Sequence, residues 1–91
     1  MYRILIVEDD RTIAQLLAEY LQRWGFDAEY AEDFSDVTGT FLTFQPHLVL
    51  LDISLPFYDG YYWCAEIRKR SKVPVLFLSS RTENMDIVMA M

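Results

Sequence analysis

Cysteine, histidine, glycine and proline are all scarce in this sequence, which has one cysteine, one histidine, three glycines and three prolines in 91 residues. The single cysteine, Cys64, excludes an internal disulfide and a cysteine-rich zinc site. No apolar run approaches the roughly 18–20 residues that a membrane-spanning helix requires. The N-terminus leads directly into a predicted strand, so we expect an unprocessed, cytoplasmic protein with no membrane partner.

Positive charge is also limited, because 8 lysines and arginines face 14 aspartates and glutamates, for a net charge of −6. Nucleic-acid phosphates require a positive surface, so this stretch is not expected to bind nucleic acid by itself. The glycine-rich patterns G-x-G-x-x-G and G-x-x-x-x-G-K-[ST] are absent, which argues against a nucleotide-binding module. The hydrophobic content of 53% is sufficient for the packed core of one small domain.

The stretch from His47 to Gly60, HLVLLDISLPFYDG, organises the predicted fold. Its unbroken aliphatic run, Leu48 to Leu51, is typical of a strand buried on both faces in a parallel sheet. Asp52 follows this strand, and open α/β sheets bind their ligands beyond the carboxyl ends of the strands. A second apolar strand, Ile4 to Val7, is also followed by acids. These are Glu8, Asp9 and Asp10. We therefore expect three or four carboxylates to meet at one edge of the sheet.

A helix is predicted after the first strand, capped by Asp9 or Asp10 and closed by Gly25. Its apolar residues follow helical spacing and predict a single buried face. They are Ile13, Leu16, Leu17, Tyr20, Leu21 and Trp24.

The later segments alternate between strand and helix patterns, which predicts a right-handed, parallel α/β sheet. Thr82 and Glu83 are expected to begin a last helix that carries Ile87, Val88 and Met91. The other expected elements are a short edge strand at Phe26–Ala31, a short or loosely held helix within Asp33–Phe44, a helix at Tyr61–Arg70 and a strand at Val73–Leu78.

The acids can form a pocket of hard oxygen ligands, which suits Mg²⁺. Glu8, Asp9 and Asp52 would repel one another, and a divalent ion would relieve that repulsion. Asp52 would then be either a permanent ligand or a nucleophile toward phosphorus. Ser79, at the end of the predicted fourth strand, would place a hydroxyl within reach of a phosphate on Asp52.

Simpler interpretations of these residues stay open. The acids at 8–10 can merely cap a helix, and Ser79 can be a solvated turn hydroxyl. Asp59 and Gly60 are interpreted as a turn and a helix start, and His47 as a strand-entry residue. Cys64 is expected to pack in the core, and so are the aromatic residues, although the aromatics can also form a partner-binding patch. The aromatics are Phe57, Tyr58, Tyr61 and Tyr62.

Three motifs, ILIVEDD, LVLLDISLP followed by DG, and PVLFLSSR, together resemble the receiver domain of two-component response regulators. The likeness covers the whole chain and is greatest to receivers of transcription factors with a C-terminal winged-helix domain. It implies a flavodoxin-like, doubly wound parallel sheet of order 2-1-3-4-5. In this chain we expect order 2-1-3-4, with the family's fifth strand and last helix missing, so that 1–91 is an incomplete receiver domain.

The resemblance also implies roles for individual residues. Asp52 would accept phosphate from a sensor histidine kinase, in a reaction that controls a DNA-binding output domain absent from this chain. Glu8, Asp9, Asp52 and the backbone carbonyl of Ser54 would hold Mg²⁺, and Ser79 would be the switch hydroxyl. The chain would take part in its own phosphorylation without being a turnover enzyme.

The sequence departs from the family in several ways. The phosphate-pairing lysine and the switch aromatic of the family lie beyond Met91, and nothing shows that Arg81 replaces the lysine. Ser80 stands where the family usually has Ala. The absent fifth strand would leave Val73–Leu78 as an edge strand, so we expect homodimerisation or self-association through that edge, or a rearrangement.

Two rival functions remain. A phosphorylation-independent interaction module, or an inactive receiver fragment, is the stronger one because the lysine is missing. A Mg²⁺ phosphatase is less favoured, because such enzymes commonly carry a second acid two residues after the strand-end aspartate, where this chain has Ser54.

Overall fold

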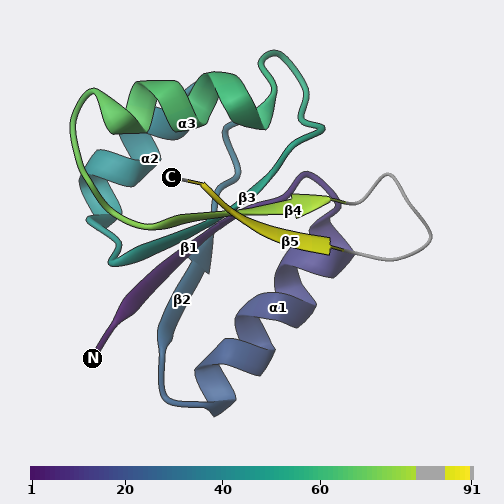
Figure 1. The fold of residues 1–91 in the computed structure, drawn as a ribbon. Coiled ribbons are helices and arrows are strands. Elements are labelled where there is room, and N and C mark those ends of the chain that lie inside the picture. Colours follow the sequence, from purple (N-terminus) through teal and green to yellow (C-terminus); the bar gives the residue numbers. More distant parts are fainter. Residues whose placement is uncertain (80–85, 91) are drawn as a thin grey trace.

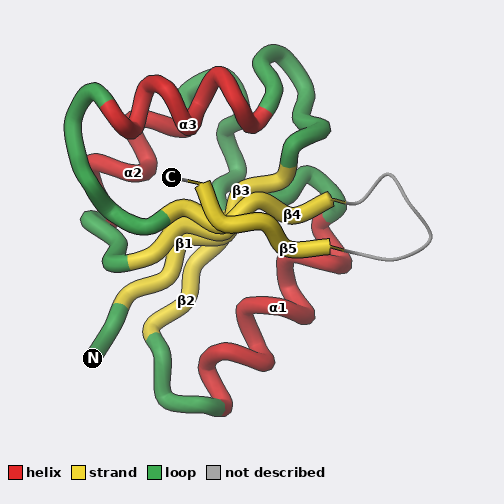
Figure 2. Tube along the Cα trace, in the orientation of Figure 1, coloured by secondary structure: helices red, strands yellow, loops and turns green. Residues whose placement is uncertain are grey.

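The computed structural model describes residues 1–79 and 86–90, which form a five-stranded sheet of order β2-β1-β3-β4-β5. The strands lie side by side (Figure 2). The first four pair in parallel, and β5 pairs with β4 in antiparallel orientation. The strands are β1 (Arg3–Val7), β2 (Asp27–Tyr30), β3 (Leu48–Asp52), β4 (Val75–Ser79) and β5 (Asp86–Ala90). The predicted parallel arrangement of order 2-1-3-4 is therefore confirmed.

Helices cover both faces of the sheet, with α1 (Arg11–Arg23) on one face (Figure 1). On the other face lie α2 (Val37–Phe44) and α3 (Gly60–Arg68). None of the helices in the described part of the chain has the length and apolar character that a membrane span requires. The arrangement places both faces of β1 and β3 in the interior, which explains their near-continuous aliphatic sequences.

Among the residues whose burial is described, 1–78, two hydrophobic clusters, one on each face, form the core. On the α1 face, Ile4, Ile6 and Leu50 pack with small residues of α1 and β2. On the α2 and α3 face, Leu5, Val7, Val49 and Leu51 pack with large side chains from both helices. The main helix contributors there are Val37, Phe41, Trp63 and Ile67. Alternate residues of each strand thus serve opposite faces, as the two-residue period of a strand requires.

The orientation of α1 differs from the prediction. Ala14 and Ala18 are its fully buried residues, whereas Leu16, Tyr20 and Trp24 are exposed, Trp24 at 68%. Leu17 and Leu21, also on the predicted face, do pack against the core. The small alanine side chains let the helix approach the sheet closely, so larger apolar residues lie beside that contact. The predicted start and end are confirmed, since Asp10 is the N-cap and Gly25 follows the C-cap with φ +90°.

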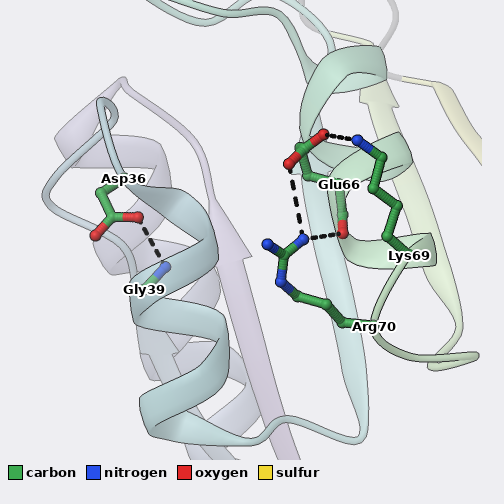
Figure 3. A network of polar contacts seen from close by, with 5 residues as sticks. All are labelled: Asp36, Gly39, Glu66, Lys69 and Arg70. Atoms are coloured by element: carbon green, nitrogen blue, oxygen red, sulfur yellow. Dashed lines mark hydrogen bonds and ion pairs between the residues drawn. The ribbon is translucent and has the colours of Figure 1, made fainter.

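The helix α2 is short, as predicted from its poor helix-forming residues. Its N-cap is Asp36, whose Oδ1 accepts a hydrogen bond of 2.9 Å from the Gly39 backbone N–H (Figure 3). The helix ends at Gln45, which adopts a left-handed conformation with φ 53° directly before Pro46. The Asp36 cap and the left-handed C-cap residue Gln45 therefore set the two ends of a helix whose residues have low helix propensity.

The end of α3 carries a small ionic network. Glu66 forms an ion pair of 2.7 Å with Lys69, and its other oxygen lies 3.7 Å from the Arg70 guanidinium (Figure 3). Arg70 also donates a hydrogen bond to the Glu66 backbone carbonyl. Cations near a helix C-terminus offset its partial negative charge, as predicted for this basic segment.

The C-terminal segment differs most from the prediction. Ile87 and Val88 lie in the strand β5 and not in a helix, while Thr82, Glu83 and Met91 lie outside the described residues. β4 is consequently an internal strand, and the expectation that Val73–Leu78 forms a free edge is wrong. The physical reason is that β4 offers a row of backbone donors and acceptors, which β5 pairs along its length from Val75 to Ser79. β-Branched residues suit such a strand.

The amino ends of β1 and β3 are joined through backbone and side-chain groups. The Arg3 N–H donates to Nδ1 of His47 at 2.9 Å, and the His47 N–H donates to the Arg3 carbonyl at 2.7 Å. The Arg3 Nε donates to the carbonyls of Phe44 and Gln45, which end α2. His47 is thus a strand-entry residue, as predicted.

Candidate metal and phosphoacceptor site

Three carboxylates converge where β1 and β3 end. The two strands are parallel neighbours with Val7 opposite Leu51, so Glu8 and Asp52 leave the sheet side by side. One ligand oxygen from each of Glu8, Asp9 and Asp52 lies within 4.8 Å of the others. Glu8 and Asp52 are 2% and 1% exposed, whereas Asp9 faces solvent. The convergence predicted from strand-end acids is confirmed among the described residues.

Asp10, the next acid, has a separate role. Its Oδ1 accepts hydrogen bonds from the backbone N–H groups of Thr12 at 3.0 Å and Ile13 at 3.3 Å, which caps α1. Its own N–H donates to Glu8 Oε2 at 3.1 Å. The structure therefore assigns the helix cap to Asp10 and leaves Glu8 and Asp9 directed to the acid cluster.

Burial makes the charged form of Glu8 costly. Burial, which is the largest cause, and the neighbouring Asp52 and Asp9 together raise the pKa of the Glu8 carboxyl from 4.5 to about 7, while the hydrogen bond from the Asp10 N–H opposes the shift. The Oε1 atom of Glu8 is buried and has no hydrogen-bond partner within the described residues. An unsatisfied buried carboxylate oxygen beside two further acids is the chemistry that a hard divalent cation satisfies, so these residues fit Mg²⁺.

The loop after β3 holds the backbone around Asp52. The Ser54 N–H donates to Asp52 Oδ1 at 3.3 Å, which brings the Ser54 main chain beside the carboxylate. The Gly60 N–H donates to the Ile53 carbonyl at 2.8 Å and closes the loop at the first residue of α3. Asp59 caps that helix by accepting from the Tyr62 N–H at 2.8 Å.

Gly60 lies against the end of β3, which its sequence pattern does not predict. The Asp-Gly pair was interpreted as a turn and a helix start, and Asp59 does serve as the cap. Gly60, however, lies against the Asp52 backbone so closely that a Cβ would overlap the Asp52 carbonyl oxygen. The sequence holds one indication of this contact. Glycine has low helix propensity, yet Gly60 stands at the first position of a helix shortly after Asp52.

Ser79 ends β4, one residue after Leu78, which lies opposite Asp52 in the parallel pairing of β3 and β4. Its backbone is therefore at the same edge of the sheet as the acids. Ser80 and Arg81 lie outside the described residues.

The aromatic residues beside the site are more exposed than predicted. Phe57 is 78% exposed and has a left-handed backbone, with φ 69°. Tyr58 and Tyr62 stack with ring centroids 4.2 Å apart, and Tyr61 leans on Phe77 at 5.1 Å. The preference for ordinary packing was wrong for Phe57 and only partly right for the tyrosines. Cys64 packs against the core, as predicted, but is only half-buried.

Comparison with known proteins identifies the family to which this geometry corresponds. The model of the response regulator receiver domain matches residues 4–91. The chain is 54% identical to the response regulator protein GraR of Staphylococcus epidermidis over 89 residues, and 51% identical to YvcP, an uncharacterized transcriptional regulatory protein of Bacillus subtilis, over 90 residues. The match to GraR covers 98% of this chain and 40% of GraR. The match to YvcP covers 99% of this chain and 38% of YvcP.

Solved structures agree with the sequence comparison. TrrA of Thermotoga maritima, a response regulator solved with Mg²⁺ and BeF, superimposes with a TM-score of 0.82 at 35% identity. That match covers 90% of this chain and 72% of TrrA. TrrA has also been solved in complex with the histidine kinase ThkA.

Proposed function

Because this chain belongs to the response regulator receiver domain family, we propose that it accepts a phosphoryl group on Asp52 in a Mg²⁺-dependent reaction. The donor would be a sensor histidine kinase, and residues 1–91 would act as one receiver domain. The kinase complex of TrrA supports this choice of donor. The chain would be a phosphorylated switch and not a turnover enzyme.

The observation that carries the proposal is the grouping of Glu8, Asp9 and Asp52 at the carboxyl edge of the sheet. These side chains, with the Ser54 backbone carbonyl, would hold Mg²⁺. When bound, the ion supplies positive charge that stabilises the charge developing on the phosphoryl oxygens.

Asp52 would act as the nucleophile. A new bond would join its carboxylate oxygen to phosphorus while the bond from phosphorus to the donor nitrogen breaks, and that nitrogen would keep the electron pair. The Ser54 N–H, 3.3 Å from Asp52 Oδ1, would hold one carboxylate oxygen so that the other faces the donor. Ser79 would contribute its hydroxyl to the transferred phosphate, which its position at the end of β4 supports.

The output of the switch would be transcription. The description of YvcP as a transcriptional regulatory protein, of which this chain spans 38%, supports a DNA-binding domain elsewhere in a longer chain. A cytoplasmic location would place the receiver beside both its kinase and the regulated DNA.

The test is incubation with Mg²⁺ and acetyl phosphate, followed by intact mass measurement. We expect a gain equal to one phosphoryl group in the wild type and none in Asp52→Asn. Asp59→Asn is the matched control, because asparagine keeps an acceptor for the Tyr62 N–H and Asp59 lies outside the acid cluster.

The proposal is overturned if Asp52→Asn gains the same mass, or if the wild type binds Mg²⁺ and gains none. The second result would favour the phosphorylation-independent interaction module.

A further inference from the structure

Gly60 lies directly behind the proposed phosphoacceptor. A Cβ at this position would overlap the Asp52 carbonyl oxygen and would lie 3.0 Å from both the Asp52 carbonyl carbon and the Ile53 Cα. All three of these atoms belong to the main chain, which cannot rotate aside as a side chain can. Any side chain at residue 60 would therefore displace the end of β3 or the beginning of α3.

The same residue also closes the loop that contains the proposed backbone ligand. The hydrogen bond of 2.8 Å from the Gly60 N–H to the Ile53 carbonyl ties the first residue of α3 to the residue after Asp52. Ser54, the next residue, donates its N–H to Asp52 Oδ1. The contact of Gly60 with Ile53 thus lies next to both proposed Mg²⁺ ligands of this segment, the Asp52 carboxylate and the Ser54 carbonyl.

The other two glycines have different physical reasons for being glycine. Gly25 has φ +90° and open space where a Cβ would be, so its backbone conformation requires it. A Cβ on Gly39 would meet only the side chain of Asp36, which is exposed and can move. Gly60 has no positive φ, and what it provides is close approach to a functional segment.

We propose that Gly60 is a positioning residue for the acid cluster. By letting α3 begin in contact with the end of β3, it fixes the Asp52 carboxylate and the Ser54 carbonyl relative to Glu8 and Asp9. This inference rests on the proposed function and deepens it, because it names the contact that sets the geometry of the reaction. Displacement of a reacting group by a fraction of a bond length is costly in such sites.

The test compares Gly60→Ala with Gly39→Ala, which make the same chemical change in two helices on the same face of the sheet. Mg²⁺ affinity is measured by titration of Trp63 fluorescence in a Trp24→Phe background, because Trp63 is buried beside Tyr58 and Tyr62 whereas Trp24 is exposed. The rate of phosphorylation by acetyl phosphate is measured by intact mass, and folding by circular dichroism.

We expect Gly60→Ala to weaken Mg²⁺ affinity and slow phosphorylation by about tenfold or more while retaining the helical signal. Gly39→Ala should change both by less than about twofold, since its new methyl group meets only the exposed Asp36 side chain, which lies outside the acid cluster. Equal values for Gly60→Ala and the wild type would overturn the inference. If the wild type itself takes no phosphate, the proposed function fails, and the Mg²⁺ titration still tests Gly60.

If Gly60→Ala does not fold, a measurement on the wild type tests the inference instead. During an NMR titration with Mg²⁺, the Gly60 and Ser54 amide signals should shift with one common midpoint while that of Gly39 stays fixed. An unchanged Gly60 signal would overturn the inference.

Discussion

The two ends of the sheet differ in how their polar groups are satisfied. At the amino ends of β1 and β3, Arg3 and His47 exchange two hydrogen bonds, and the Arg3 side chain reaches two carbonyls at the end of α2. At the carboxyl ends, Glu8 and Asp52 are buried together, and one Glu8 oxygen has no partner among the described residues. One end joins elements of the fold, whereas the other buries carboxylates that, with Asp9, could hold a metal ion.

This difference separates stability from function within one small sheet. Burying a carboxylate without compensation costs free energy, and proteins keep such groups mainly where chemistry requires them. The raised pKa of Glu8 is the local sign of that cost. Changes at the amino end should therefore alter stability alone, and changes at the carboxyl end should alter Mg²⁺ binding as well.

The largest expected effect is a dependence of stability on pH that originates at Glu8. The pKa of Glu8 is about 7 in the folded chain against an ordinary value of 4.5, so the folded state holds the proton more tightly. The contribution of Glu8 is fully present below pH 4.5 and is lost as pH rises through 7. Without Mg²⁺, we expect a loss on the order of 2–3 kcal/mol across this window.

Urea denaturation at several pH values measures this loss. Glu8→Gln should remove the Glu8 part of the pH dependence, and saturating Mg²⁺ should flatten the wild-type curve because the ion binds the deprotonated form. If the free energy of unfolding depends on pH between 4.5 and 7 equally in the wild type and in Glu8→Gln, groups other than Glu8 cause the dependence.

A second prediction separates two adjacent acids. Asp10→Ala should lower the free energy of unfolding by about 1 kcal/mol, because it removes the N-cap of α1. Asp9→Ala should leave stability nearly unchanged without Mg²⁺ and should abolish most of the stabilisation that Mg²⁺ provides. Thermal unfolding with and without Mg²⁺ distinguishes the two variants, and an exchange of their behaviour would show that the cap and the ligand are wrongly assigned.

The smallest expected effect is at the amino end. His47→Leu removes the acceptor of the Arg3 N–H, and because that bond is exposed we expect a loss of about 0.5 kcal/mol. His47→Asn should recover part of it, since the asparagine oxygen can accept in place of Nδ1. Neither variant should change Mg²⁺ affinity. A change in affinity would mean that the two ends of the sheet are energetically coupled.

The parallel sheet and the acid cluster could be predicted from the sequence for the same physical reason. Unbroken aliphatic runs identify strands buried on both faces, and residues that directly follow such strands must meet at one edge. The grouping of Glu8, Asp9 and Asp52 follows from that rule. Their roles toward Mg²⁺ and phosphate, and that of Ser79, stay predictions.

The features that were missed depend on three-dimensional packing. Hydrophobicity identified Leu16 and Tyr20 as part of the buried face of α1, but alanines permit the closest contact with the sheet. The helix around Ile87 was predicted from a start at Thr82 and Glu83, whereas the backbone groups of β4 pair with this segment as a strand. The closeness of Gly60 to Asp52 is a property of space that an Asp-Gly pair does not reveal.

The antiparallel pairing of β5 with β4 has a consequence for any strand that would join the sheet beside β4. That position already holds a segment of the same chain, connected to β4 by only six residues, 80–85. A tethered segment competes at an effective concentration in about the millimolar range, so an incoming strand must displace it before it can pair. Addition of a strand beside β4 is therefore an exchange reaction, whose apparent affinity depends on how readily β5 leaves.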